Sequence, residues 1–216
     1  DKLITVKANR EVILSAGSIG SPHILQVSGI GDSEKLKKYG IKTIHELKGV
    51  GKNLQDHLMF RPVYKVKNLK SLNSKTNSLI GNFLIGLEYI FNQSGPMTMG
   101  ASQVCGFVKS DPSRATPNLQ FHVQPISTDI LGASKMHDFD GITPTVANVR
   151  PTSRGEINIV SKDSRENPKI KMNYLSTEDD RKVAADGLRL VRKIIFKSET
   201  FKKYNPEEIR PGPKFQ

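Results

Sequence analysis

The 216-residue chain has no tryptophan, a single cysteine and only 6% aromatic residues. One cysteine cannot form an internal disulfide, so a disulfide-stapled fold is excluded, and a reducing compartment is compatible with the sequence. That cysteine, Cys105, lies in an apolar run typical of a strand. We expect it to be a small buried hydrophobic side chain rather than a nucleophile.

Long apolar segments are also missing. No stretch approaches the ~20 uninterrupted apolar residues that a membrane-spanning helix requires. The first residues, DKLITVKANREVIL, alternate and carry charge where a signal peptide has its apolar core. Together with the lone cysteine, this favours a cytoplasmic protein, with peripheral association with a membrane still compatible.

The formal net charge is +12, which raises the question of a polyanionic partner. The lysines are spread along the whole chain, without basic runs interleaved with aromatic residues. We therefore expect no nucleic-acid binding and assign the charge to a solvated surface. The histidines His23, His45 and His137 lack the spacing typical of metal ligands, so no metal site is expected.

The N-terminal quarter of the sequence alternates between strand and helix patterns. Residues 3–7 and 11–15 are predicted strands, the second an apolar run typical of a buried strand. Small residues follow, and Ser21 and Pro22 predict the cap and first turn of a helix that continues to Val27. Small residues between a strand and a helix N-terminus let a ligand approach the backbone closely.

The pattern changes after His57, where strands alternate with longer helical stretches. We therefore predict an α+β fold: a βα piece over 1–57, a mainly antiparallel sheet with flanking helices over 58–204, and a tail over 205–216. The predicted strands of the second part are 58–66, 102–109, 117–125, 142–150, 155–160 and 168–173, and the further helices of the chain are Ser33–Tyr39, Leu79–Phe91 and Thr177–Ser198.

The predicted strand 117–125 carries a polar row. Gln120, His122 and Gln124 alternate with apolar residues, so they point to one face of the sheet. This row either faces solvent or lines a ligand cavity. In the second case His122 is the preferred substrate-binding residue, and Gln124 is its companion.

Three stretches together resemble the glucose–methanol–choline oxidoreductase family. Residues 10–31 read REVILSAGSIGSPHILQVSGIG, residues 47–57 read LKGVGKNLQDH, and residues 150–157 read RPTSRGEI. The order and spacing of all three agree with that family, and the third stretch is most similar to its choline dehydrogenases. The resemblance covers nearly all of the chain.

The resemblance implies FAD as cofactor and assigns candidate residues to it. The backbone at the end of strand 11–15 would lie beside the ribose or pyrophosphate, although small residues here also pack a helix on a sheet. The turn after Gly51 would lie near the flavin, although its polar side chains equally fit loop capping. The cofactor candidates are Ser15, Ala16, Gly17, Asn53, Asp56 and His57.

The resemblance also identifies what this sequence lacks. The family's N-terminal GxGxxG unit and its C-terminal catalytic histidine have no counterpart here, so we interpret the chain as an internal fragment without a catalytic residue of its own. The implied reaction oxidises a primary alcohol to an aldehyde by hydride transfer to flavin, with choline the best guess and an aliphatic or polyether alcohol the rival. The electron acceptor is not identified. A binding module or an inactive remnant is the alternative from another class.

Overall fold

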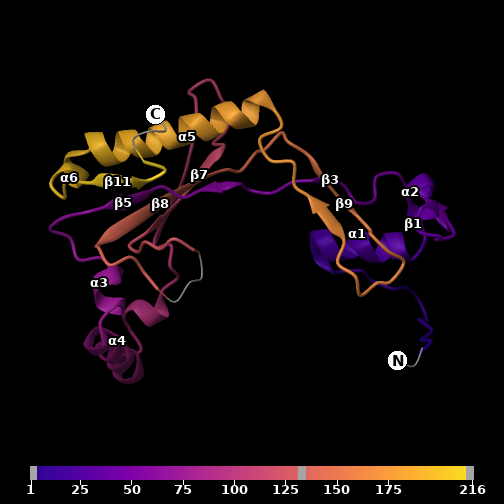
Figure 1. The fold of residues 1–216 in the computed structure, drawn as a ribbon, viewed down its shortest axis with the longest axis horizontal. Helices are drawn as coiled ribbons and strands as arrows, with labels where there is room; N and C mark the ends of the chain where they lie inside the picture. The colour runs from indigo at the N-terminus through magenta and orange to yellow at the C-terminus, as the bar shows by residue number, and fades with distance from the viewer. Residues whose placement is uncertain (1–3, 131–134, 213–216) are drawn as a thin grey trace. The chain divides into compact units, whose positions relative to one another are not determined.

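The computed structural model describes residues 4–130 and 135–212 (Figure 1). The chain divides into two compact units: unit 1 comprises Asp1–Asp56 and Ser153–Ser176, and unit 2 comprises His57–Thr152 and Thr177–Gln216. The boundary after Asp56 lies where the sequence pattern changes. Residues 153–176, expected with the second part, group with the first because their strands pair there.

Unit 1 is built on a three-stranded antiparallel sheet in the order β10-β9-β3. Helix α1 contacts the central strand β9. Strands β1 and β2 form a separate parallel pair, and β1 contacts both α1 and α2. The elements are α1 Gly17–Val27, β1 Ile30–Gly31, α2 Ser33–Lys37, β2 His45–Glu46, β3 Lys52–Leu54, β9 Gly155–Asn158 and β10 Lys169–Lys171.

The strands predicted at 3–7 and 11–15 are wrong for the described part of the chain. Residues 4–15 form no strand, and the side chains of Val12 and Ile13 are 78% and 75% exposed. A strand exists only through hydrogen bonds to a neighbour, and the described residues offer these segments none. The apolar run at 11–15 is typical of a strand, but a strand also needs a neighbouring strand, which local sequence does not specify.

Helix α1 begins earlier than expected. It starts at Gly17 and carries Pro22 inside it, whereas the sequence predicted a start at Pro22. The Ser21 hydroxyl accepts a hydrogen bond from the Ala16 N–H at 3.1 Å, instead of capping a helix that begins after it. This hydrogen bond spans the first turn of α1. The backbone N–H groups at the start of the helix are therefore those of Gly17 and Ser18.

Unit 2 contains a six-stranded antiparallel sheet in the order β11-β5-β8-β7-β6, with β4 also pairing with β8. The mainly antiparallel α+β fold predicted from the sequence is confirmed. The strands are β4 Met59–Phe60, β5 Val63–Lys65, β6 Val104–Val108, β7 Leu119–Gln124, β8 Gly141–Asn148 and β11 Glu207–Arg210; the helices are α3 Leu72–Thr76, α4 Leu79–Asn92, the 3-10 turn η1 Pro96–Thr98, α5 Glu178–Lys197 and α6 Glu199–Lys202.

Helix α5 covers one face of this sheet and forms the core of unit 2 (Figure 1). Its apolar stripe packs on alternate residues of β7 and β8, and each such buried Val or Ile contributes roughly 1.5–3 kcal/mol. Gly187 lets the helix approach closely, because a Cβ there would lie 3.1 Å from a Val146 methyl group. The buried residues of this core are Tyr64, Val66, Leu119, Phe121, Ile142, Val146, Val183, Val191 and Ile195.

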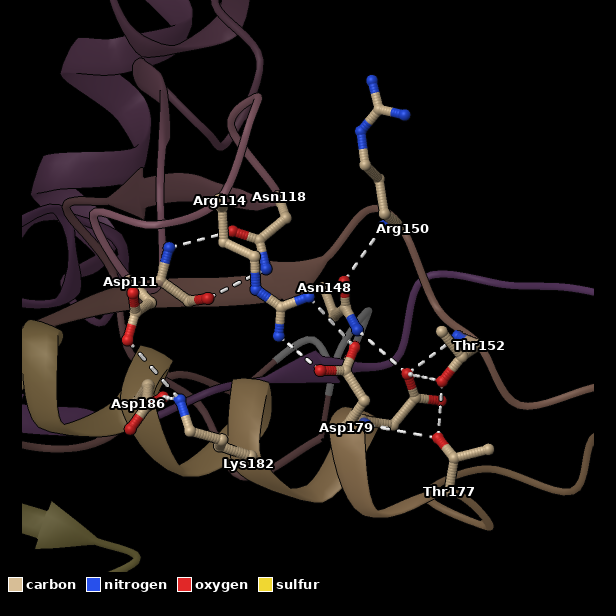
Figure 2. Close-up of polar contacts among 12 residues, drawn as sticks. Asp111, Arg114, Asn118, Asn148, Arg150, Thr152, Thr177, Asp179, Lys182 and Asp186 are labelled. Carbon is tan, nitrogen blue, oxygen red and sulfur yellow. Dashed lines mark hydrogen bonds and ion pairs between the residues drawn. The ribbon is translucent and has the colours of Figure 1, made fainter.

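The N-terminus of α5 is fixed to the end of the sheet by buried polar contacts (Figure 2). The Asp180 carboxylate, 4% exposed, accepts hydrogen bonds from the Asn148 amide at 3.2 Å and from the Thr152 N–H at 2.8 Å. The Thr177 hydroxyl caps the helix by accepting from the Asp180 N–H at 3.3 Å. A carboxylate at a helix N-terminus also interacts favourably with the helix dipole.

Replacing Asp180 with alanine is expected to lower the free energy of unfolding of unit 2 by about 2–4 kcal/mol, because the buried Asn148 amide and the partly buried Thr152 N–H would lose their acceptor. Urea unfolding followed by circular dichroism measures this. Asp186→Ala is the matched control on the same helix: Asp186 forms exposed ion pairs with Lys182 and Arg189, and its loss should cost under about 1 kcal/mol. Equal losses for the two variants would contradict the anchoring role.

Candidate cofactor and substrate sites

A hollow of about 300 Å³ lies in unit 1 between the start of α1 and strand β3. Asn53, one of the predicted cofactor residues, lines it, and Ser18 borders it directly after the predicted Gly17. Ser15 and Ala16 precede this helix start and are exposed. The lining residues are Ser18, Pro22, Gly51, Lys52, Asn53, Leu54, Gln55 and Ile157.

Two features of the backbone give this hollow its shape. Gly51 has φ +77°, and a Cβ there would lie 2.1 Å from the Ile157 carbonyl oxygen, so only glycine lets the turn lie against β9. Asn53 adopts the left-handed region at φ +63°, which asparagine tolerates better than most residues. The resulting bend presents the Asn53 side chain to the hollow.

The helix and the sheet are held together by one buried amide, which the sequence analysis missed. The Gln26 Nε2 group donates to the Ile157 carbonyl at 3.0 Å, and its Oε1 accepts from the Ile159 N–H at 3.2 Å. Gln26 is 3% exposed and bonds the backbone at the end of β9, beyond the residues that pair with β3. No local sequence signal reports a contact between residues 131 positions apart.

The hollow fits part of a nucleotide cofactor. Gly17 has φ +74° and a Cβ there would meet no atom within 4 Å, so the backbone at the start of α1 is open to a ligand. The first turn of α1 carries no acidic residue, so its N–H groups and dipole favour an anionic group. Lys52 adds a cation at the rim. This donor set suits a phosphate and its sugar, as the predicted role of Gly17 and Asn53 requires.

A second hollow of about 270 Å³ shares Lys52 and Asn53 with the first and adds cationic residues that the sequence analysis did not single out. Arg154 and Lys171 line it. Glu156 also lines it, but its carboxylate is bound by Lys35 at 3.2 Å. Hydrogen bonds from Asn158 and Lys35 lower the pKa of Glu156, so the carboxylate stays charged and partly balances the lysines.

Asp56, another predicted cofactor residue, accepts a hydrogen bond from the Tyr174 hydroxyl. The contact joins residues 118 positions apart, and sequence spacing did not indicate it. This hydrogen bond, with burial and repulsion between the carboxylate and a phenolate, raises the pKa of Tyr174 to about 12. Asp56 is therefore engaged within unit 1, and the boundary between the two units falls between Asp56 and the predicted His57.

In unit 2 the predicted polar row lies on the face of β7 opposite to Leu119 and Phe121. Gln124 is buried: its Nε2 donates to the Ser102 hydroxyl at 3.2 Å, and its Oε1 accepts from Arg61 at 3.4 Å. His122 is half-buried, and its Nδ1 lies 3.3 Å from the Cys105 sulfur. Packing therefore encloses Gln124, whereas Gln120 and His122 are half-buried.

The expectation for Cys105 is also wrong. Its side chain is exposed, because β6 is the outermost strand of the sheet and the face that carries Cys105 is not covered by α5. An apolar run in the sequence identifies a strand, but it does not distinguish an edge strand from a central one.

Comparison with known proteins first defines the class. The fold is similar to formate oxidase from Aspergillus oryzae RIB40, a protein with a modified FAD, at TM-score 0.81 and 27% identity over 95% of this chain and 40% of that one. An FAD-dependent oxidoreductase from Chaetomium thermophilum has a similar fold, with a TM-score of 0.81 and 22% identity over 98% of this chain and 42% of that one. The class is that of FAD-dependent oxidoreductases, and the expectation of FAD as its cofactor is confirmed.

The family follows from the sequence matches. Residues 2–59 match the N-terminal model and residues 151–215 the C-terminal model of GMC oxidoreductases, so the chain belongs to the GMC oxidoreductase family. It is 40% identical to the oxygen-dependent choline dehydrogenases of Chromohalobacter salexigens, over 97% of the chain, and of Staphylococcus aureus (strain JH9), over 100% of it. The chain spans 37% of the length of each of these relatives.

The helices of the protein are short or carry many charged residues. Within 4–130 and 135–212, none is long and apolar enough to cross a membrane.

Replacing Gln26 with leucine is expected to destabilise unit 1 by about 1–3 kcal/mol, because the Ile157 carbonyl and the Ile159 N–H lose a buried partner. Hydrogen exchange provides the local measurement: protection of the Ile159 amide should fall by at least about tenfold. Gln55→Leu is the control, since Gln55 makes only an exposed 3.5 Å contact with the Asn53 carbonyl. Unchanged protection of Ile159 in Gln26→Leu would refute the role of this amide.

The Tyr174–Asp56 contact predicts a pH dependence. Because the pKa of Tyr174 is raised to about 12, its hydrogen bond stabilises the fold below the ordinary tyrosine value, near pH 10, and this stability is lost as pH rises through about 12. Asp56→Asn should bring the titration of Tyr174 back towards about 10. Absorbance of the tyrosinate follows the titration, and Tyr174→Phe identifies its contribution. A titration of Tyr174 that Asp56→Asn leaves unchanged would count against the contact.

Proposed function

We propose that this chain is the part of an FAD-dependent alcohol dehydrogenase that supplies one portion of the FAD site from unit 1 and substrate contacts from the polar face of unit 2. The observation that carries the proposal is the 40% identity with oxygen-dependent choline dehydrogenases along the whole chain. The open helix start at Gly17 beside a hollow of about 300 Å³ supports it, because such a place accepts an anionic cofactor group.

In this proposal the α1 N-terminus and Asn53 hold the phosphate and sugar of the cofactor. Ser15 and Ala16 provide the small, exposed approach to the helix start, and Asp56 orients Tyr174 at the far end of the same turn. FAD, when bound, supplies the acceptor for hydride from the alcohol carbon. We assign no side chain of this chain to the removal of the hydroxyl proton. His57 remains a candidate for the flavin side from unit 2.

For the alcohol, we assign His122 as the main contact and Gln124 as its support. The His122 ring is half-buried on the face of the sheet opposite to α5 and can donate or accept a hydrogen bond. The Gln124 amide already bonds Ser102 and Arg61, so we assign it to positioning these neighbours rather than to binding the alcohol directly. The neighbouring Arg61 guanidinium would repel a quaternary ammonium at Gln124 itself, which assigns the hydroxyl end of a choline-like alcohol, rather than its cation, to this side.

The proposed substrate is a primary alcohol, and choline is favoured over an aliphatic or polyether alcohol. The preference rests on the relatives, because a quaternary ammonium is best bound by aromatic rings or a carboxylate, and the chain has no tryptophan. We propose that the protein acts in the cytoplasm, with peripheral contact to a membrane compatible, without nucleic acid as a partner, and with an electron acceptor that is not identified.

The 216-residue chain by itself is expected to retain no FAD through gel filtration and to oxidise no alcohol, because it spans 37% of its relatives' length. Flavin absorbance of the eluted protein and dye reduction measure both. Retained flavin, or turnover by the chain alone, would contradict the proposal that this chain supplies only part of the FAD site and of the catalytic machinery.

The matching positive experiment reads the coding DNA on both flanks and expresses the whole reading frame. A strand–GxGxxG–helix unit upstream, and choline-dependent dye reduction faster than with aliphatic or polyether alcohols, would support the choline proposal. Preference for an aliphatic or polyether alcohol would move the assignment to that substrate class. Stop codons directly beside Asp1 and Gln216 would overturn the enzyme in favour of a binding module or remnant.

A further inference from the structure

Helix α4 turns its apolar side away from the rest of unit 2. Its large aliphatic and phenylalanine side chains fall on one side of the helix, which we call the α4 stripe. No residue of α4 is buried, and Ile80, Phe83 and Ile90 are 72%, 64% and 69% exposed. A surface helix normally buries such a side, so the stripe needs a partner. The stripe consists of Leu79, Ile80, Phe83, Leu84, Leu87, Ile90 and Phe91.

Contacts at the start of α4 impose the outward direction of the stripe. A Cβ on Gly81 would lie 2.1 Å from the Lys75 carbonyl oxygen, so only glycine lets α4 lie against the end of α3. The Asn82 amide donates to the Thr76 carbonyl at 2.9 Å. The Ser78 hydroxyl caps α4 by accepting from the Gly81 N–H at 3.2 Å. A rotation that buried the stripe would break these contacts.

Helix α3, on which α4 packs, is itself anchored by a buried amide. Asn73 is 0% exposed; its Nδ2 group donates to the Ser127 hydroxyl at 2.9 Å, and its Oδ1 accepts from the Ser127 N–H at 2.9 Å. Helix α4 lies beyond α3, on the side of the sheet away from α5 (Figure 1). The stripe is therefore held at the margin of unit 2 by a fixed support.

The segment that leads into α4 supplies positive charge. Residues 57–87 contain no Asp or Glu, and Lys67, Lys70 and Lys75 are exposed within them. None of these three lysines forms an ion pair within residues 4–130 and 135–212. The Asp140 carboxylate at the start of α3 is bound instead by the Ser71 N–H at 2.7 Å and hydroxyl at 2.9 Å. The lysines are therefore available to an anionic surface.

We propose that α4 and these three lysines are a docking surface for an anionic phospholipid membrane. The α4 stripe enters the boundary between headgroups and acyl chains, and the lysines contact the phosphates. A helix of 14 residues lies in that boundary, because it is too short to span a bilayer. Charge favours this occupant over a second copy of the chain, which would bring like charges together. The proposal does not depend on the FAD site or on alcohol oxidation.

Vesicle flotation tests the proposal with the 216-residue chain and with the product of the whole reading frame. The vesicles contain equal amounts of phosphatidylcholine and phosphatidylglycerol, or phosphatidylcholine alone. Both proteins should bind the mixed vesicles at least about tenfold more strongly than the neutral ones, and high salt should weaken this binding. A whole product that does not bind the mixed vesicles overturns the proposal, because the rest of the polypeptide then covers the stripe.

Two variants of the 216-residue chain separate the stripe from general apolar exposure. Phe83→Ser/Ile90→Ser should lower binding to the mixed vesicles by at least about tenfold, because the stripe loses two of its large side chains. Phe107→Ser/Ile44→Ser is the matched control, since these side chains are 59% and 75% exposed on other elements, and it should bind like the wild type. Circular dichroism checks that both variants fold. Equal losses for the two variants overturn the proposal.

A second pair of variants separates the local lysines from the net charge. Replacing Lys67, Lys70 and Lys75 with glutamine should weaken binding to the mixed vesicles by at least about tenfold. The control makes the same replacement at the exposed Lys37, Lys38 and Lys42 of unit 1 and should leave binding unchanged. Equal losses for these two triple variants also overturn the proposal, because net charge alone would then explain the binding.

Two further outcomes identify what failed. If light scattering shows a dimer that Phe83→Ser/Ile90→Ser dissociates, and the wild type does not bind vesicles, the stripe belongs to an interface between copies and the membrane proposal is overturned. If the whole product oxidises choline without binding the mixed vesicles, the membrane proposal fails and the proposed enzymatic function stands.

Discussion

The covering of one sheet face by α5 is the constraint on which unit 2 depends. The helix stripe of Val183, Val191 and Ile195 packs on β7 and β8, and Asp180 fixes the start of the helix to the end of β8. Because successive strand residues alternate between faces, the polar side chains of β7 lie on the face opposite to α5. The polar row containing His122 is therefore a consequence of where the apolar residues are buried.

Unit 1 depends on a different kind of interaction, namely buried hydrogen bonds from a side chain to the backbone. Gln26 satisfies backbone groups at the end of β9, beyond its pairing with β3, and Gly51 allows the turn before β3 to touch the same strand. These two residues bring the start of α1 next to Asn53 and form the hollow that suits a phosphate. A helix N-terminus and a turn from separate parts of the sequence thus become one candidate site.

Much of the fold could be predicted from the sequence, and less of the site. The helix at Thr177–Ser198 and the strands of unit 2 were predicted from local pattern, because apolar residues repeat at about 3.6 residues in a helix and 2 in a strand. The family was predicted from motifs. The strands at 3–7 and 11–15 were wrong, since pairing is not local. Asn53 lines the hollow of unit 1, whereas the long-range contacts of Gln26, Tyr174 and Lys171 could not be predicted from local sequence.

The sequence by itself determined the helices and strands of unit 2, the family of the chain and the residue types available for binding. Tertiary structure alone decided that Cys105 is exposed beside His122, that Gln124 is buried against Arg61, and that residues 153–176 belong with the first 56. The physical reason is range. Propensity and periodicity act over a few residues, but burial and hydrogen-bond pairing join residues more than a hundred positions apart, and only the folded chain specifies those partners.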